Sequence, residues 1–268
     1  MARVLMALKL GLGLMLLLIV TACKTFWSDD SDEDDGPFKG KSAQVIFKEA
    51  NAALAKKDYT TAVKDYEGLE TLYPFNDFAE TAGMKLIYAY YKKEDYASAA
   101  ASAERFIHLY PRAAHVDYAY YMKALANSHQ PRGAITVMIP VDESWRDPGT
   151  ESLAYSDFST FVQKFPNSRY KNNALQHLIH LRNMFAQTEY NVANYYYERR
   201  MYVAAIERAG YLVKTYPEAP SVKPALALIY YANKSLGLMS AAADARQVYL
   251  DTYHREPELS YNPDLSIN

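Results

Sequence analysis

The stretch Lys57-Asp58-Tyr59-Thr60-Thr61-Ala62 decides the fold because related stretches recur later in the chain. They are Glu94-Asp95-Tyr96-Ala97-Ser98-Ala99 and Arg200-Met201-Tyr202-Val203-Ala204-Ala205. Each is followed by a tyrosine and a proline, at Tyr73-Pro74, Tyr110-Pro111 and Tyr216-Pro217. A half copy follows at Tyr155-Ser156-Asp157-Phe158 and ends in Phe165-Pro166. A degenerate final copy follows at Leu238-Met239-Ser240-Ala241-Ala242 and ends in Tyr253-His254, without the proline. Repetition of this kind predicts an array of similar structural units.

The unit resembles the tetratricopeptide repeat, a helix-turn-helix of about 34 residues. In the first unit Ala50 and Ala62 take the small positions where the two helices cross, and Tyr66 and Leu69 fill the core. A tight crossing admits only a small residue, and Pro74 ends the second helix because proline lacks the amide donor. Equivalent positions in the second and fourth units are held by Ile87, Tyr96, Ala99, Ala103, Phe106 and Pro111, and by Ala193, Tyr202, Ala205, Ala209, Leu212 and Pro217. The expected fold is therefore an all-α tetratricopeptide-repeat superhelix of about five units.

The terminal prolines are unevenly spaced, which predicts two departures from regular repetition. Residues from about 129 to 150 contain three prolines and two glycines and predict an irregular insertion in the third unit. A second excess of residues predicts a longer helix before the fourth unit, from about Arg169 to Gln187. We expect this helix to separate an N-terminal half at residues 41–168 from a C-terminal half at residues 169–268.

The N-terminus has the layout of a secretory signal. Arg3 and Lys9 precede an apolar run over residues 10–20, which is short for a membrane span. The following Val20-Thr21-Ala22-Cys23 resembles the bacterial lipobox, in which the cysteine is lipidated and becomes the first mature residue. Residues 1–22 are then a signal peptide and Cys23, the only cysteine, carries a covalent lipid. An ordinary signal peptide that is cut further along is the alternative.

Residues beyond the proposed lipid site predict where the domain is held. Lys24 follows the cysteine, which the lipoprotein sorting rule associates with export to the outer membrane, on its periplasmic face. Residues 23–40 include an acidic run, Ser28-Asp29-Asp30-Ser31-Asp32-Glu33-Asp34-Asp35. Like charges repel and no apolar core can form there, so this segment is expected to be an extended tether.

Composition argues against several classes of protein. A formal net charge of −2 disfavours a nucleic-acid binder, and a single cysteine allows no intramolecular disulfide. His177 and His180 stand three residues apart but no third ligand follows at metal-site spacing. Glycine-rich phosphate loops and nucleophile turns are also missing from the sequence. We therefore expect neither an enzyme nor a metal or other cofactor apart from the lipid on Cys23.

Several strings outside the repeat pattern are similar to the BamD family of lipoproteins, which serve the outer-membrane β-barrel assembly machinery. The strings span about residues 40 to 215 and are Tyr73-Pro74-Phe75, Leu86-Ile87-Tyr88-Ala89-Tyr90-Tyr91-Lys92, Arg105-Phe106-Ile107, Asp117-Tyr118, Tyr121-Met122, Val141-Asp142, Arg146-Asp147-Pro148, Ser156-Asp157-Phe158-Ser159, Phe165-Pro166-Asn167-Ser168 and Tyr195-Tyr196-Tyr197-Glu198-Arg199. The resemblance implies a scaffold subunit that binds BamA, the other assembly lipoproteins and unfolded barrel proteins. It implies no nucleic-acid partner.

The same resemblance implies a substrate-binding groove in the N-terminal half. Unfolded barrels carry a terminal segment that ends in an aromatic residue and a carboxylate, which suits a groove with rings and lysines. Lys85, Tyr88, Tyr91 and Lys92 are the candidate groove residues. Tyr88 and Tyr91 share a helix face, so a place in the core remains the alternative for both tyrosines.

In the C-terminal half the resemblance implies that Arg199 and Arg208 bind the last periplasmic domain of BamA. Arginine suits this task because its planar fork grips a carboxylate through two hydrogen bonds. The alternative is a solvated surface on which Glu198 and Glu207 pair with these arginines for little gain.

Two further functions remain open on the sequence. A tetratricopeptide lipoprotein of pilus or secretin assembly would be expected to show six regular repeats without the insertion. A protein that binds peptidoglycan or DNA is the other possibility, although the near-neutral charge disfavours DNA.

Overall fold

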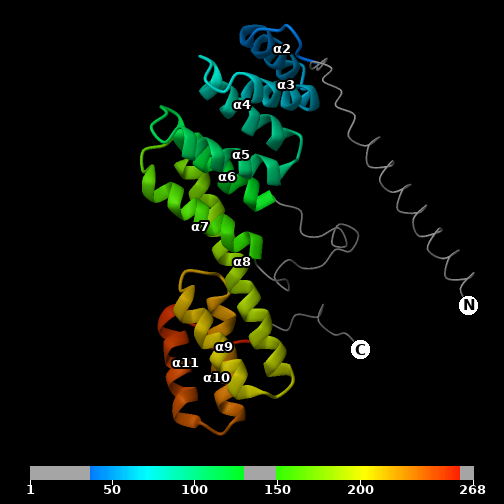
Figure 1. Ribbon diagram of the computed structural model, residues 1–268. Helices are drawn as coiled ribbons and strands as arrows, with labels where there is room; N and C mark the ends of the chain where they lie inside the picture. The colour runs from blue at the N-terminus through cyan, green and yellow to red at the C-terminus, as the bar shows by residue number, and fades with distance from the viewer. Residues whose placement is uncertain (1–36, 130–148, 260–268) are drawn as a thin grey trace, which may run out of the picture. The chain divides into compact units, whose positions relative to one another are not determined.

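The computed structural model describes residues 37–129 and 149–259, and all regular structure in these ranges is helical (Figure 1). The predicted signal peptide, Cys23, the acidic run and the string Arg146-Asp147-Pro148 lie outside the described residues. Contacts divide the chain after Ser42, and every helix described below belongs to the unit that begins at Ala43. Among the described helices, none combines the length and the apolar character that a membrane crossing requires.

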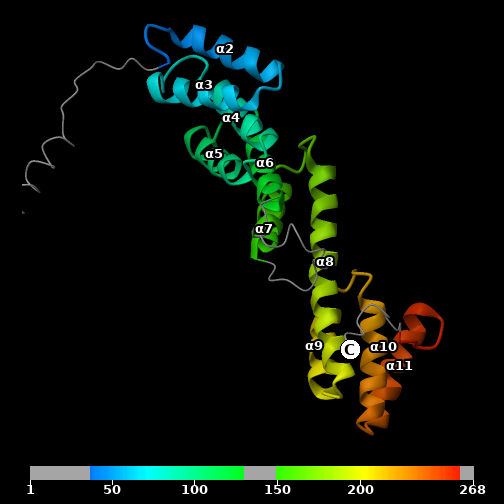
Figure 2. The same ribbon diagram turned by 90° about the vertical axis from the view of Figure 1, so that its right-hand side faces the viewer.

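Within the described residues ten helices follow one another and confirm the all-α fold (Figures 1 and 2). Each packs against the next along the chain, as expected for a repeat array. Their bounds are α2 Ala43–Ala55, α3 Tyr59–Leu72, α4 Ala79–Lys92, α5 Tyr96–Leu109, α6 Val116–His129, α7 Gly149–Lys164, α8 Lys171–Glu198, α9 Tyr202–Thr215, α10 Val222–Ser235 and α11 Met239–Tyr253.

The repeat positions occupy the core as the sequence predicts. Ala50, Ala62, Tyr66 and Leu69 are fully buried where α2 and α3 pack together. The matching alanines Ala99, Ala103, Ala205 and Ala209 are fully buried too, since only a small side chain fits between crossing helices. Small residues thus set the spacing of the helix pairs, while Phe106 and Leu212 fill the space between them.

The turn between the two helices of a unit has one geometry in the first, second, fourth and fifth units, whose turns lie within the described residues. A residue with positive φ precedes the helix-capping position at Lys57, Glu94, Arg200 and Gly237. In the first two units the next residue is an aspartate, Asp58 or Asp95, whose side chain accepts a hydrogen bond from the following helix. These four turns therefore connect their helices through the same backbone conformation.

Helix α8 is longer than the sequence analysis predicted. It runs for 28 residues from Lys171 to Glu198 and includes the first helix of the fourth unit, so the expected end near Gln187 is wrong. The helix continues because no glycine or proline interrupts the sequence between these bounds. Its first half packs into one apolar cluster through Ala174 and Leu181, and its second half packs into another through Ala193.

Candidate functional site

Two adjoining cavities lie along α4, the turn between α5 and α6, and the turn between α7 and α8. Their volumes are about 280 Å³ and 620 Å³. They share four lining residues: His115, Tyr118, Arg169 and Tyr170. Lys85 and Tyr88 complete one end, and Lys164 and Phe165 line the other. We call this continuous depression the tyrosine groove.

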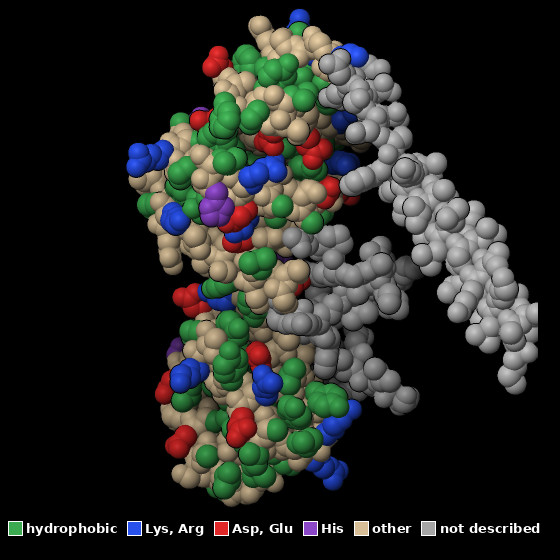
Figure 3. Space-filling model, in the orientation of Figure 1, with side chains coloured by type: hydrophobic (Ala, Val, Ile, Leu, Met, Phe, Trp, Pro, Cys, Tyr) green, Lys and Arg blue, Asp and Glu red, His purple; other side chains and the backbone are tan. Residues whose placement is uncertain are grey.

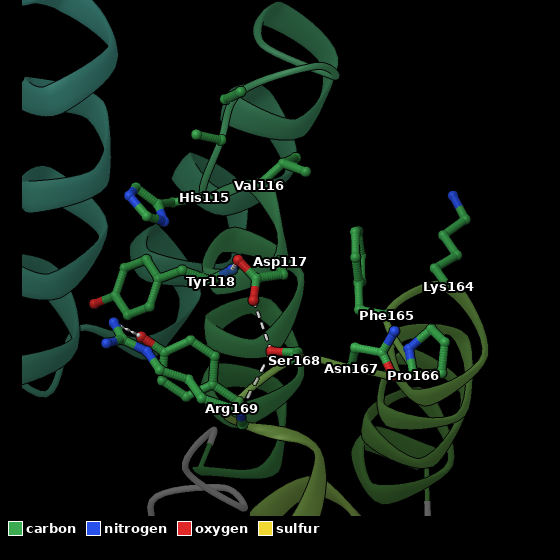
Figure 4. A pocket seen from close by; sticks show the side chains of 13 residues that line it. His115, Val116, Asp117, Tyr118, Lys164, Phe165, Pro166, Asn167, Ser168 and Arg169 are labelled. Atoms are coloured by element: carbon green, nitrogen blue, oxygen red, sulfur yellow. Dashed lines mark hydrogen bonds between the residues drawn. The ribbon is translucent and has the colours of Figure 1, made fainter.

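A hydrogen-bond chain fixes the α7–α8 turn against the start of α6 (Figure 4). The Ser168 hydroxyl donates to Asp117 Oδ2 over 2.6 Å, and the Tyr170 amide donates to the same hydroxyl oxygen over 3.2 Å. Asp117 Oδ1 accepts from the Tyr118 amide at 2.9 Å. Residues from distant parts of the sequence are therefore held together before any ligand arrives, which lowers the cost of ordering the site.

Aromatic rings form one wall of the groove. Tyr170 stacks on Tyr121 with ring centroids 4.7 Å apart and contacts Tyr118 at 5.8 Å. The Arg169 guanidinium carbon lies 4.8 Å from the Tyr170 ring centroid, a cation–π arrangement. Burial raises the pKa of Tyr118, so its hydroxyl stays protonated and remains a hydrogen-bond donor at neutral pH.

Lys85 brings a cation to the opposite end of the groove. Its Nζ lies 5.2 Å from the Phe47 ring centroid and donates to Asn51 Oδ1, an oxygen that also accepts from the Tyr66 hydroxyl at 2.9 Å. Burial lowers the pKa of Lys85 because desolvation disfavours the charged amine. An incoming carboxylate would offset that cost, which makes this end of the groove receptive to an anion.

The charge of the groove is unbalanced. Lys85, Lys164 and Arg169 line it, and within the described residues the only lining carboxylate is Asp117. Because Asp117 already accepts hydrogen bonds from Ser168 and Tyr118, little of its charge is directed at a ligand. Rings beside unneutralised cations suit a ligand that presents an aromatic side chain and a carboxylate.

The candidate groove residues separate into two places. Lys85 and Tyr88 line the tyrosine groove, and the Tyr88 side chain is 39% exposed. Tyr91 instead meets the rings of Tyr96 and His129 at 5.4 Å and 5.7 Å. Lys92 is exposed in the last turn of α4.

Tyr118, Arg169 and Tyr170 are among the groove residues that were not proposed as binding residues from the sequence. A signal for them was present, because Asp117-Tyr118 and Phe165-Pro166-Asn167-Ser168 are strings that the repeat pattern does not require. Those strings meet in space through the contact of Asp117 with Ser168.

The two candidate arginines of the C-terminal half lie at different positions with respect to α8. Arg199 follows α8, with its guanidinium carbon 3.5 Å from the Tyr195 ring centroid. Arg208 lies on α9 and pairs with Glu189 of α8 over 2.9 Å. Glu189 stands about 15 Å before Arg199 along α8, given a rise of about 1.5 Å per residue. One partner surface would therefore have to extend over several helical turns to meet both arginines.

The sequence analysis considered Glu198 and Glu207 as local partners of the two arginines, but the structure shows different contacts for Arg208 and Glu198. Arg208 contacts Glu189 rather than Glu207, because α9 packs against α8 and presents this face to it. Glu198 accepts a hydrogen bond from Asn194 over 2.7 Å, one turn earlier on its own helix. Glu189 lines a cavity of about 420 Å³ that Tyr155, Phe185 and Tyr216 also line.

His177 is a packed aromatic side chain. Its ring stacks on Phe158 at 4.8 Å with an interplanar angle of 6°. Burial, together with the nearby His129 and His180, holds its pKa below the ordinary value of 6.5. Across the described residues no group of three potential ligands of the His, Cys, Asp or Glu types is placed to hold a metal ion.

The lowered pKa of His177 predicts a loss of stability in acid. Between 6.5 and its lower folded pKa, the unfolded chain binds more protons than the folded chain, so stability falls as the pH drops through this window. Below the folded pKa the contribution of His177 no longer changes. Thermal unfolding followed above and below pH 6.5 should show a smaller acid shift for His177→Gln than for the unaltered chain. Equal shifts for both proteins would contradict the assignment.

Comparison with known proteins gives consistent matches. A family described as "YfiO: Outer membrane lipoprotein" matches residues 39–248. The chain is similar to "Outer membrane protein assembly factor BamD" of Neisseria gonorrhoeae, at 33% identity over 97% of this chain and 95% of the relative. It is also similar to proteins of that name from Xylella fastidiosa (33% identity, 89% of this chain and 80% of the relative) and Vibrio cholerae (32%, 88% and 95%).

A solved structure described as "Crystal structure of MamA protein" aligns with 82% of this chain and 98% of that chain. The TM-score is 0.30 and the sequence identity 18%, a likeness too low to support an argument about the fold.

Proposed function

This chain belongs to the YfiO family of outer membrane lipoproteins, and we propose that it is an outer membrane protein assembly factor that works by holding other polypeptides. The observation that carries the mechanism is the tyrosine groove, which combines exposed rings and cations on a rigid helical scaffold. A pre-formed groove of this kind suits the binding of an extended polypeptide segment.

The proposed ligand of the groove is the terminal segment of an unfolded β-barrel protein. Its final aromatic side chain would pack against Tyr118 and Tyr170, which already form a wall of rings. Its terminal carboxylate would accept hydrogen bonds from Arg169 or Lys85, the two cations that line the same cavity as Tyr88. Tyr88, which is exposed and lines the cavity, would cover the bound segment.

The proposed partner of the C-terminal half is the periplasmic domain of BamA. Arg208 supports this proposal because it is about half exposed and retains donors beyond the one that meets Glu189. Arg199, stacked on Tyr195, offers a second cation at the end of α8. Together with the cavity beside Glu189, these residues could receive an acidic and aromatic surface.

The proposed location is the periplasmic face of the outer membrane. It rests on the lipobox-like string that ends in Cys23 and on Lys24. Two or three acyl chains on Cys23 would hold the protein on the bilayer, because one chain alone gives only marginal binding. We assign no catalytic step, since the described residues offer a binding surface and their family relatives are named as assembly factors.

Extraction of the full chain from membranes in mild detergent, followed by affinity capture, tests the proposal. We expect a BamA-type β-barrel protein to be captured, and depletion of the chain to lower the amounts of outer-membrane barrels. Capture of a secretin or pilus component with normal barrel levels would contradict it. Retention on peptidoglycan without any barrel protein would also contradict it.

A further inference from the structure

The turns of the fourth and fifth units have the same backbone conformation as those of the first two units, but a different type of residue at the capping position. The capping position has φ and ψ of −80° and 77° at Asp58, and −86° and 72° at Asp95. The values are −85° and 60° at Met201, and −82° and 69° at Leu238. The same turn is therefore built four times, twice with a capping aspartate and twice with a large apolar residue.

The apolar residues bring no local benefit to the helices that follow them. Asp58 and Asp95 accept hydrogen bonds from the amides of Thr61 and Ser98 at 3.1 Å and 3.2 Å. Met201 and Leu238 make no such bond, and side chains without an acceptor are poor helix caps. They are also not buried, since 50% of Met201 and 52% of Leu238 remain exposed. Neither capping nor core packing explains why these residues stand there.

The two turns lie side by side at one end of the helix array. Helices α8 and α10, which these two turns follow, pack against each other. Both turns appear together beyond the ends of α8 and α10 in the two ribbon views (Figures 1 and 2). We call this surface the apolar tip; its exposed apolar residues are Met201, Val203, Leu236, Leu238 and Met239.

Cations surround the apolar tip. Arg199 and Arg200 precede Met201 in one turn, and Lys234 precedes the other turn, all with exposed side chains. Arg199 lies on the exposed ring of Tyr195, so an aromatic side chain stands at the edge of the tip as well. The nearby Glu198 accepts from Asn194. This local positive charge stands out in a chain whose formal net charge is −2. Figure 3 shows hydrophobic and basic side chains next to one another over this part of the molecule.

We propose that the apolar tip seats in the surface of a bilayer that contains anionic phospholipid. Flexible apolar side chains at the ends of two hairpins can enter the boundary between headgroups and acyl chains. Arg200 and Lys234 would then meet lipid phosphates, and Tyr195 would lie at headgroup depth, as aromatic residues do at membrane interfaces. Charge complementarity favours this occupant, and the two projecting turns fit a bilayer surface better than they fit an extended peptide.

A reporter at the tip tests the proposal on the full-length chain. Trp27 and Trp145 are the only tryptophans, so Trp27→Phe and Trp145→Phe combined with Val203→Trp leave one indole, at the tip. We expect vesicles of phosphatidylethanolamine and phosphatidylglycerol with brominated acyl chains to quench its emission. Vesicles of phosphatidylcholine should quench it less, because they lack the anionic headgroup.

The decisive variant restores the residue used in the first two turns. Met201→Asp with Leu238→Asp adds two caps and removes two apolar side chains, so the unfolding temperature should stay the same or rise. Apparent affinity of the tip for anionic vesicles should fall by about tenfold or more, as two apolar side chains are lost and two negative charges are gained. The matched control is Leu109→Asp with Val248→Asp, which changes two exposed apolar residues away from the tip and should leave quenching unchanged.

Three results would overturn the proposal. The first is an indole at position 203 that brominated lipid does not quench. The second is quenching that survives Met201→Asp with Leu238→Asp. The third is a fall in unfolding temperature for this variant, which would show that Met201 and Leu238 serve the fold. An unquenched indole together with lost capture of a protein partner by the variant would identify the tip as a protein-docking surface instead.

Discussion

Arg169→Glu is expected to weaken binding of a peptide that ends in an aromatic residue and a free carboxylate by about tenfold to a hundredfold. The guanidinium lies over the Tyr170 ring at the centre of the tyrosine groove, within reach of both cavities. Reversal of its charge removes a charge-assisted hydrogen bond and adds repulsion to the carboxylate. Because Arg169 is exposed, the fold should not change. Titration calorimetry or fluorescence anisotropy with the purified chain measures the effect.

The matched control for this variant is Arg255→Glu, the same charge reversal at an exposed arginine beyond α11. It should bind the peptide as the unaltered chain does. A second control is the same peptide with an amidated end, which should bind weakly to the unaltered chain and equally weakly to Arg169→Glu. If Arg169→Glu still prefers the free acid to the amide, the groove does not read the carboxylate through Arg169.

Arg208→Glu is expected to lower affinity for the periplasmic domain of BamA by about thirtyfold or more, the loss typical when one member of an interface charge pair is removed. Arg208 is about half exposed and is held in place by Glu189. The interface would require it to grip a carboxylate of the partner through the donors that do not meet Glu189. Co-purification from membranes and binding of the purified domain both report the change.

Two variants separate partner binding from a purely structural role of the Arg208–Glu189 pair. Glu189→Arg with Arg208→Glu keeps an ion pair between α8 and α9 but reverses its direction. If the pair only holds the helices together, this swap restores binding. If Arg208 meets the partner, the swap leaves binding as weak as Arg208→Glu alone. Glu189→Gln, which frees Arg208, should leave binding equal or stronger.

The fold was accessible from the sequence because the repeat encodes it locally. Small residues such as Ala62 and Ala99 mark the helix crossings, and each unit ends at a proline or its equivalent. The boundaries of the long helix were less accessible. The repeat pattern predicts a turn between Lys171 and Glu198. The structure instead has one continuous helix there, because no residue in this range breaks a helix.

The candidate site was only partly accessible. Lys85 and Tyr88 could be predicted from the sequence because they lie close together on one helix. Tyr118, Arg169 and Tyr170 could not. They line the groove because a hydrogen bond between Asp117 and Ser168 joins two turns that are far apart in sequence. The partner of Arg208 was also beyond local reasoning. Glu207 is its neighbour in the chain, whereas Glu189 becomes its neighbour only when α9 packs on α8.

The most direct test of the central claim is site-specific photo-crosslinking of the full chain to an unfolded β-barrel protein. A photoreactive phenylalanine analogue would replace Tyr88 or Tyr170 in the groove, and Val248 on α11 as the control. The account predicts crosslinks at the two groove positions that map to the last segment of the barrel protein, and few at position 248. Crosslinks that are equally frequent at position 248, or that map to internal segments of the barrel, would contradict it.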